Sequence, residues 1–86
     1  MKQNHVVRAL MTYHLGDAQE ELTRVLDLMI PDEELDEAEF RSRMAHLYYH
    51  LNTAWNMRGA SDGQQELADS EQLRRWSRFP EDLDPL

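Results

Sequence analysis

Apolar side chains recur every three or four residues over the first third of the chain. With His14 filling one step, the series is Val7, Met11, Ala18, Leu22, Val25 and Met29. This spacing places the whole series on one face of an α-helix. Because Pro31 cannot continue a helix, the pattern predicts one helix that ends just before that proline. Gly16 is the point at which this helix is expected to bend, if it bends at all.

A second series with the same spacing runs through Phe40, Met44, Leu47, Leu51 and Ala54 to Arg58. Asp36, followed three residues later by Glu39, forms a capping box that marks the start of the second predicted helix. The two predicted helices are long and the connection around Pro31 is short, so they are expected to form an antiparallel hairpin. In such a hairpin, residues whose numbers sum to about 66 lie at the same level.

A shorter third helix is predicted over about residues 69–78, with Leu73 and Trp76 on its apolar side and Pro80 as its stop. The expected fold is all-α: a long antiparallel helical hairpin plus this short C-terminal helix. Residues 1–79 are expected to form a single helical domain, and residues 80–86 an extended acidic tail.

Helical rotation assigns the remaining side chains to the two sides of the hairpin seam. One side carries apolar residues, namely Leu15, Leu26 and Ile30 from the first helix and Tyr48 and Trp55 from the second. Burying such a surface is favourable, so something is expected to cover it. The segment around Trp76 is one candidate. A second copy of the hairpin is the other, and it would give a four-helix bundle as a homodimer.

Composition excludes several classes of protein. The 86 residues include no cysteine, which removes disulfide scaffolds, thiolate zinc sites and cysteine nucleophiles. A formal net charge of −8 disfavours direct binding to nucleic acid or to an anionic membrane. No apolar run approaches the length of about 20 residues that spans a membrane. We therefore expect a small acidic protein of the cytoplasm.

The other side of the seam carries the candidate metal ligands. His46 and His50 are four residues apart, the spacing that helical zinc sites use. The hairpin register places Asp17 and Glu21 opposite them, which would complete a site for zinc or another divalent ion. The alternative is a pair of interhelical ion pairs, Asp17 with His50 and Glu21 with His46, without a cofactor. His14 lies on the seam itself and is expected to hydrogen-bond a neighbour such as Asn52 or Tyr48.

The densest aromatic and amide stretch predicts a surface for a protein partner. Its candidate partner-binding residues are Tyr48, Tyr49, Asn52, Trp55 and Asn56, together with Trp76 from the third helix. The alternative is that the third helix covers this surface and that the amides satisfy the polar groups at its ends.

No motif of a catalytic triad or a phosphate-binding loop occurs, so we expect no enzyme. The sequence favours a small non-catalytic interaction module, an adaptor or a regulator, that binds a protein partner or itself. Ten acids between residues 17 and 39, against Arg24 alone, suggest an alternative: an acidic inhibitor or nucleic-acid mimic that blocks a basic partner. A divalent-metal site at His46 and His50 is the second alternative.

Overall fold

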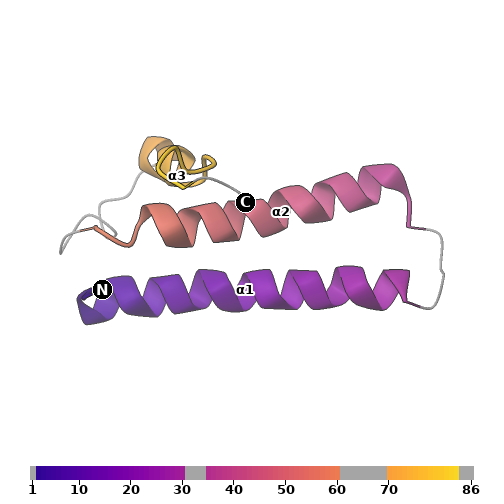
Figure 1. Ribbon diagram of the computed structural model, residues 1–86, viewed down its shortest axis with the longest axis horizontal. Coiled ribbons are helices and arrows are strands. Elements are labelled where there is room, and N and C mark those ends of the chain that lie inside the picture. The colour runs from indigo at the N-terminus through magenta and orange to yellow at the C-terminus, as the bar shows by residue number, and fades with distance from the viewer. Residues whose placement is uncertain (1, 31–34, 61–69, 84–86) are drawn as a thin grey trace.

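The computed structural model describes residues 2–30, 35–60 and 70–83. It contains three helices, α1 (His5–Met29), α2 (Glu37–Asn56) and α3 (Ser70–Trp76). α1 and α2 run antiparallel and pack against each other along their length, while α3 lies beside the C-terminal half of α2 (Figure 1). The described ranges contain no strand, and the predicted all-α hairpin with a short third helix is confirmed.

Polar side chains fix the beginnings of both long helices. Asn4 precedes α1, and its Oδ1 accepts a hydrogen bond from the backbone N–H of Val7 at 2.8 Å. Asp36 precedes α2 as predicted, and its Oδ1 accepts from the backbone N–H of Ala38 at 2.7 Å. Each contact satisfies one of the amide groups that a helix N-terminus leaves without a partner. α1 continues through Gly16 without a break.

The hairpin seam is narrower than the sequence pattern predicts. Its buried apolar side chains are Val7, Ala18 and Val25 from α1 and Leu47, Ala54 and Met57 from α2 and its C-terminal cap. Leu22, Phe40 and Leu51, which the pattern also placed in the seam, remain 45%, 37% and 40% exposed. Two helices bury only a strip of each other's surface. Only the centre of each apolar stripe is therefore buried between the two helices.

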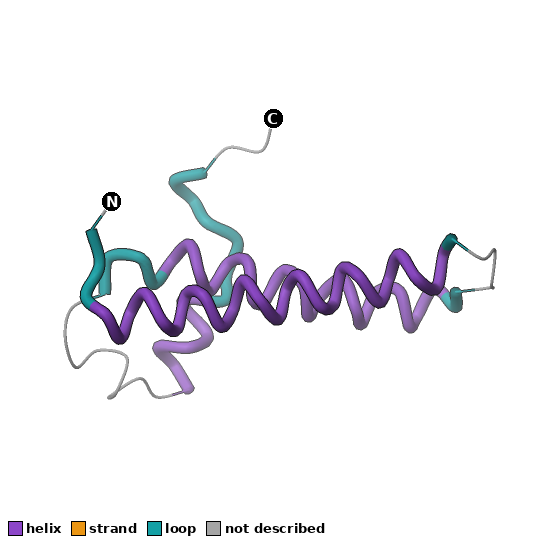
Figure 2. The backbone as a smooth tube through the Cα atoms, turned by 90° about the horizontal axis from the view of Figure 1, so that it is seen from below, coloured by secondary structure: helices purple, strands orange, loops and turns teal. Residues whose placement is uncertain are grey.

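The third helix is shorter than expected, with seven residues, and the proposed start at Asp69 lies outside the described ranges. α3 packs against α2 through Trp76, which is 8% exposed, and contacts no part of α1 among the described residues. The segment after α3 crosses from one side of the hairpin to the other (Figure 2). Within the predicted tail of residues 80–86, residues 81–82 form a turn, and Asp82 accepts a hydrogen bond from Trp55 of α2. Residues 84–86 of that predicted tail lie outside the described ranges.

Candidate functional site

The side of the seam that carries Asp17, Glu21, Arg43, His46 and His50 is the polar flank. Glu21 is its centre, with a side chain only 5% exposed although it lies on a two-helix hairpin. One carboxylate oxygen, Oε1, lies 3.3 Å from Arg43 Nη1, and the other, Oε2, lies 3.4 Å from His46 Nδ1 and 3.5 Å from Arg24 Nη1. A buried carboxylate needs such partners, since burial without them is costly.

Three histidines line up beside this carboxylate. His14 Nδ1 lies 2.9 Å from His50 Nδ1, and His50 Nε2 lies 3.0 Å from His46 Nε2. Asp17 Oδ2 is 3.7 Å from the same His50 Nε2. The predicted pairs of Asp17 with His50 and Glu21 with His46 are therefore present. The partner predicted for His14, Asn52 or Tyr48, is wrong, because in this register the side chain of His14 meets His50.

Only one arrangement of neutral tautomers satisfies all three contacts. A carboxylate accepts hydrogen bonds and cannot donate, so the contact with Glu21 requires a proton on His46 Nδ1. The Nε2 atom of a neutral His46 is then an acceptor, and His50 must donate from its own Nε2. His50 Nδ1 accepts in turn from His14 Nδ1–H. The three rings thus form a chain of hydrogen bonds with one direction, from His14 to Glu21.

The surroundings lower the pKa of two of these rings. Burial lowers the pKa of His50, and neighbouring His46 lowers it further, whereas Asp17 and Glu21 act in the opposite direction. Burial is also the main cause that lowers the pKa of His14, followed by the proximity of His50. On the exposed edge of the cluster, the charge of Asp17 and its hydrogen bond raise the pKa of the Tyr13 phenol. Neutral imidazoles are the form that binds metal ions.

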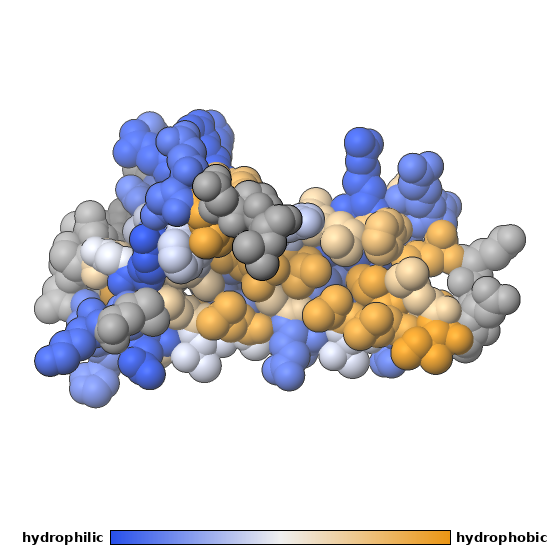
Figure 3. Space-filling model, in the orientation of Figure 1, coloured by the Kyte–Doolittle hydropathy of each residue, from blue (hydrophilic) through white to orange (hydrophobic). Residues whose placement is uncertain are grey.

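The opposite side of the seam is the apolar flank. It comprises the exposed residues Leu15, Leu22, Leu26, Met29 and Ile30 of α1 and Phe40, Tyr48 and Leu51 of α2. Their side chains are between 37% and 77% exposed, with Ile30 the most exposed. Figure 3 shows an apolar band that extends over both long helices. The sequence placed Leu15, Leu26, Ile30 and Tyr48 on this side, and their exposure agrees with that assignment.

The predicted amides of the partner-binding surface contact the chain's own C-terminal segment. Asn52, only 8% exposed, donates from Nδ2 to the carbonyl of Ser77 at 3.1 Å. Asn56 donates from Nδ2 to the carbonyls of Trp76 and Arg78, both at 2.7 Å. These carbonyls end α3 and have no partner within it. The alternative weighed from the sequence, in which the third helix uses these amides, is the arrangement in the structure.

The other candidates of that surface differ in their positions. Trp76 is buried against α2. Tyr49 is half-buried beside the polar flank, and its ring meets His14 edge-on with centroids 6.0 Å apart. Tyr48 is 47% exposed on the apolar flank, with its ring centroid 6.5 Å from that of Phe79. The structure therefore does not gather the six predicted residues on one open surface.

Trp55 is held by contacts that the sequence did not indicate. Its Nε1–H donates to Asp82 Oδ1 at 2.9 Å, and the guanidinium carbon of Arg58 lies 3.8 Å from the centre of its ring. Arg58 also binds Asp82, with Nη2 2.9 Å from Oδ2. The hydrogen bonds from Trp55 and Arg58 lower the pKa of Asp82. This contact lies at the end of the apolar flank, where a groove of about 390 Å³ is lined by Met11, Leu15, Leu51, Ala54, Trp55, Arg58 and Leu83.

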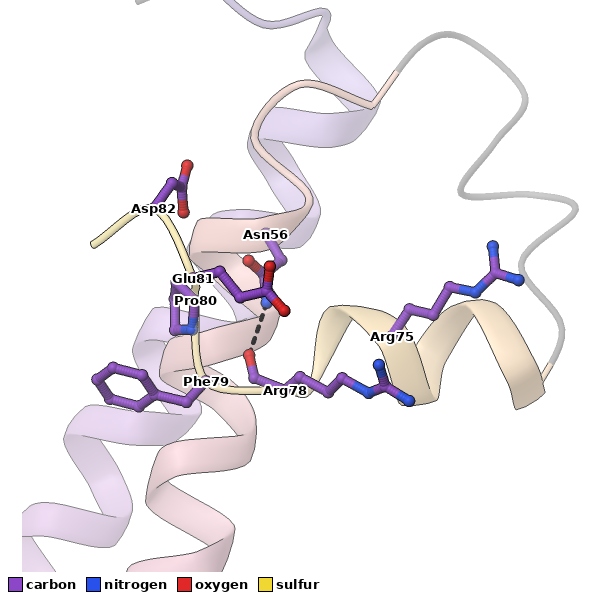
Figure 4. Close-up of a pocket in the computed structure, with 7 residues that line it drawn as sticks. All are labelled: Asn56, Arg75, Arg78, Phe79, Pro80, Glu81 and Asp82. Carbon is purple, nitrogen blue, oxygen red and sulfur yellow. Dashed lines mark hydrogen bonds between the residues drawn. The ribbon is translucent and has the colours of Figure 1, made fainter. Parts of the chain in front are cut away.

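A second hollow, of about 380 Å³, lies between α2, α3 and the segment that follows (Figure 4). Asn56 forms its floor, and the side chains of Arg75, Arg78 and Glu81 surround it. Arg75 pairs with Glu71 at 2.8 Å, and the amide of Asn56 is occupied as described above. The hollow is an open surface feature that is lined mainly by polar and charged side chains.

Comparisons with known proteins provide no further guide: no family model, no curated protein sequence and no solved structure matches the chain. Within the described ranges no helix has the length and apolar composition needed to cross a bilayer. Asp32, Glu33 and Glu34, at the centre of the predicted acidic turn, lie outside those ranges. The acidic-inhibitor alternative therefore stays a prediction.

Proposed function

We propose that the protein is a small non-catalytic interaction module that pairs with a second copy of itself through the apolar flank. The observation that carries this proposal is the half-exposed apolar band along both long helices. Apolar patches of this extent are rare on monomeric proteins and favour an interface. Among the described residues α3 packs on α2 and not on α1, and the segment after α3 reaches the α1 part of the band only at its end, where Leu83 lies beside Met11 and Leu15.

The amount of exposed surface supports a second copy as the occupant. The accessible surface is 6730 Å², whereas a compact monomer of 10.2 kDa exposes about 5300 Å². The excess is about 1400 Å², roughly a quarter of the expected surface. It is larger than the area of about 800 Å² that each partner buries in a standard interface. Two hairpins packed on these bands form a four-helix bundle, the arrangement in which such stripes are normally buried.

Charge favours an antiparallel arrangement of the two copies. Asp27 and Glu37 lie near the turn end of the hairpin, while Arg8 lies near the open end. A two-fold axis across the middle of the band brings the turn end of one copy to the open end of the other. Opposite charges then approach each other, and the two acidic ends stay apart.

Sedimentation equilibrium between about 1 and 200 μM tests the proposal, because the weakest interfaces of standard size have micromolar affinity. We expect a species of twice 10.2 kDa that dissociates on dilution. Leu26→Glu, in the middle of the band, should give the monomer. Val6→Glu is the matched control, since Val6 is 45% exposed, against 47% for Leu26, but lies almost on the opposite side of α1.

A wild-type protein that remains at 10.2 kDa at the highest concentration would contradict the proposal. So would dissociation by Val6→Glu to the same extent as by Leu26→Glu. Circular dichroism of both variants checks that the helices persist, which is expected because both side chains already face solvent.

A further inference from the structure

We infer that the polar flank binds one divalent transition-metal ion of the kind that prefers imidazole, such as Zn²⁺, through Nε2 of His46 and Nε2 of His50. The third ligand is the carboxylate of Asp17. This site lies on the side of the hairpin opposite the apolar flank, so it does not depend on pairing between two copies.

The spacing of the two ring nitrogens fits a shared ion. At metal–nitrogen distances of about 2.0–2.1 Å, nitrogens 3.0 Å apart subtend an angle of about 94° at the metal. This angle is suited to square or octahedral coordination, and an opening of about 0.3 Å gives the tetrahedral angle that zinc prefers. The His50 side chain is only 6% exposed, so this opening comes from the His46 side chain, which is 53% exposed.

The carboxylate of Asp17 comes from the neighbouring helix. Its Oδ2 lies 3.7 Å from His50 Nε2, a few tenths of an ångström beyond the separation of about 3.4 Å between two ligands of one tetrahedral ion. In the described part of the chain no three side chains of the metal-ligating types already surround one point. The Asp17 side chain, 32% exposed, therefore has to rotate toward the two imidazoles, and water completes the coordination.

The strongest support for the metal site comes from the groups that face the Nδ1 atoms of the two imidazoles. Metal-bound histidines almost always donate a hydrogen bond from the second ring nitrogen, which fixes the orientation of the ring. His46 Nδ1 faces Glu21 Oε2 at 3.4 Å, and His50 Nδ1 faces His14 Nδ1 at 2.9 Å. The second nitrogen of His46 thus faces a carboxylate acceptor, and that of His50 faces a ring nitrogen that becomes an acceptor once His14 carries its proton on Nε2. This pair of contacts also gives the largely buried carboxylate of Glu21 a role that a surface ion pair would not need.

Binding changes where the protons lie without changing their number. In the metal-free chain His50 carries its proton on Nε2, directed at His46. When the metal occupies both Nε2 atoms, this proton is lost from His50 Nε2 and His50 is protonated on Nδ1, from which it donates to His14. The proton of His14 correspondingly moves from Nδ1 to Nε2. All three rings stay neutral, so the rearrangement of protons creates no new charge that a further side chain would have to balance.

Titration calorimetry of protein stripped with a chelator tests the site, with Zn²⁺ as the probe. We expect saturable binding of one Zn²⁺ per chain, and none of Mg²⁺ or Ca²⁺, which prefer oxygen ligands. Glu21→Gln should weaken the affinity about 10–100-fold, the usual effect of losing an outer hydrogen-bond partner. His46→Gln should weaken it more. His5→Gln is the matched control, because it removes a histidine from α1 outside the cluster.

Nitrogen-15 spectra of the imidazole rings in the unaltered protein avoid any doubt about the folding of variants. Zn²⁺ should shift the Nε2 signals of His46 and His50 and leave those of His5 in place. The inference is overturned if the dissociation constant for zinc is above about 100 μM, because designed and natural zinc sites bind far more tightly. It is also overturned if His46→Gln and His5→Gln bind alike, or if zinc leaves the Nε2 signals of His46 and His50 in place. Leu26→Glu, which tests pairing of the chains, should bind Zn²⁺ like the wild-type protein.

Discussion

Replacing Asn56 by alanine should weaken the attachment of the C-terminal segment to α2. Its amide group holds the carbonyls of Trp76 and Arg78, both at 2.7 Å, and no other described side chain is hydrogen-bonded to either carbonyl. A hydrogen bond contributes about 0.5–1.5 kcal/mol net, so removing two costs about 1–3 kcal/mol. The carbonyl of Arg78 is exposed and can bind water instead, which places the expected loss near 1–2 kcal/mol.

This loss is large for a domain of 86 residues, whose total stability is about 4–13 kcal/mol. It should lower the melting temperature by roughly 5–15 °C, measured by circular dichroism. Ser42→Ala is the control, since Ser42 is also a helical residue of α2 but is exposed and far from α3. Asn56→Asp should destabilise at least as much as Asn56→Ala, because it preserves the size of the side chain but removes the donor. If Asn56→Ala melts like Ser42→Ala, the amide does not anchor the segment and the reasoning is wrong.

Three further predictions concern other parts of the chain. Gly16→Ala should raise the stability by about 0.5–1 kcal/mol in chemical denaturation, because the added methyl group meets nothing within 4 Å and the helix there is regular; a loss of stability would mean that α1 is strained at this point. Asp36→Ala should lower the stability by about 1 kcal/mol in the same assay and Asp36→Asn much less, whereas equal losses would indicate that the cap hydrogen bond is not the cause. The pKa of Asp82 is lowered in the folded protein, so its contribution to stability is present above the pKa of the unfolded chain and is lost as the pH falls through the lowered value. The difference in tryptophan emission between the wild type and Asp82→Asn should therefore be clear at pH 7 and vanish once the pH is below the lowered pKa. A difference that stays constant with pH would contradict this.

The register of the hairpin could be predicted from the sequence because both long helices have an uninterrupted apolar period and the connection between them is short. This is why Asp17 and Glu21 were expected beside His50 and His46. The periodicity could not predict how much of each stripe is buried. It shows on which face of a helix a side chain lies, but not whether another part of the protein packs on that face.

The contacts at the site that the sequence left open depend on features that helical periodicity does not specify. The amides of Asn52 and Asn56 lie on the side of α2 away from the seam, as predicted. What they bind depends on the position of α3, a helix of seven residues, and of the segment after it, and no periodic pattern specifies that position. His14 was assigned to the seam correctly. Its contact with His50 depends on the rotamers of two rings, which the spacing of residues does not determine.

The one-sided attachment of α3 has a consequence for local opening of the native state. α3 packs against α2 alone, so it can separate and return while the interface between α1 and α2 stays closed. Proteins often open in such cooperative units, each with its own free energy. Amide protons in α3 should accordingly exchange with solvent much earlier than those buried along the hairpin around Val25 and Leu47. The molecule then behaves as two folding units of unequal strength that share a single helix, α2.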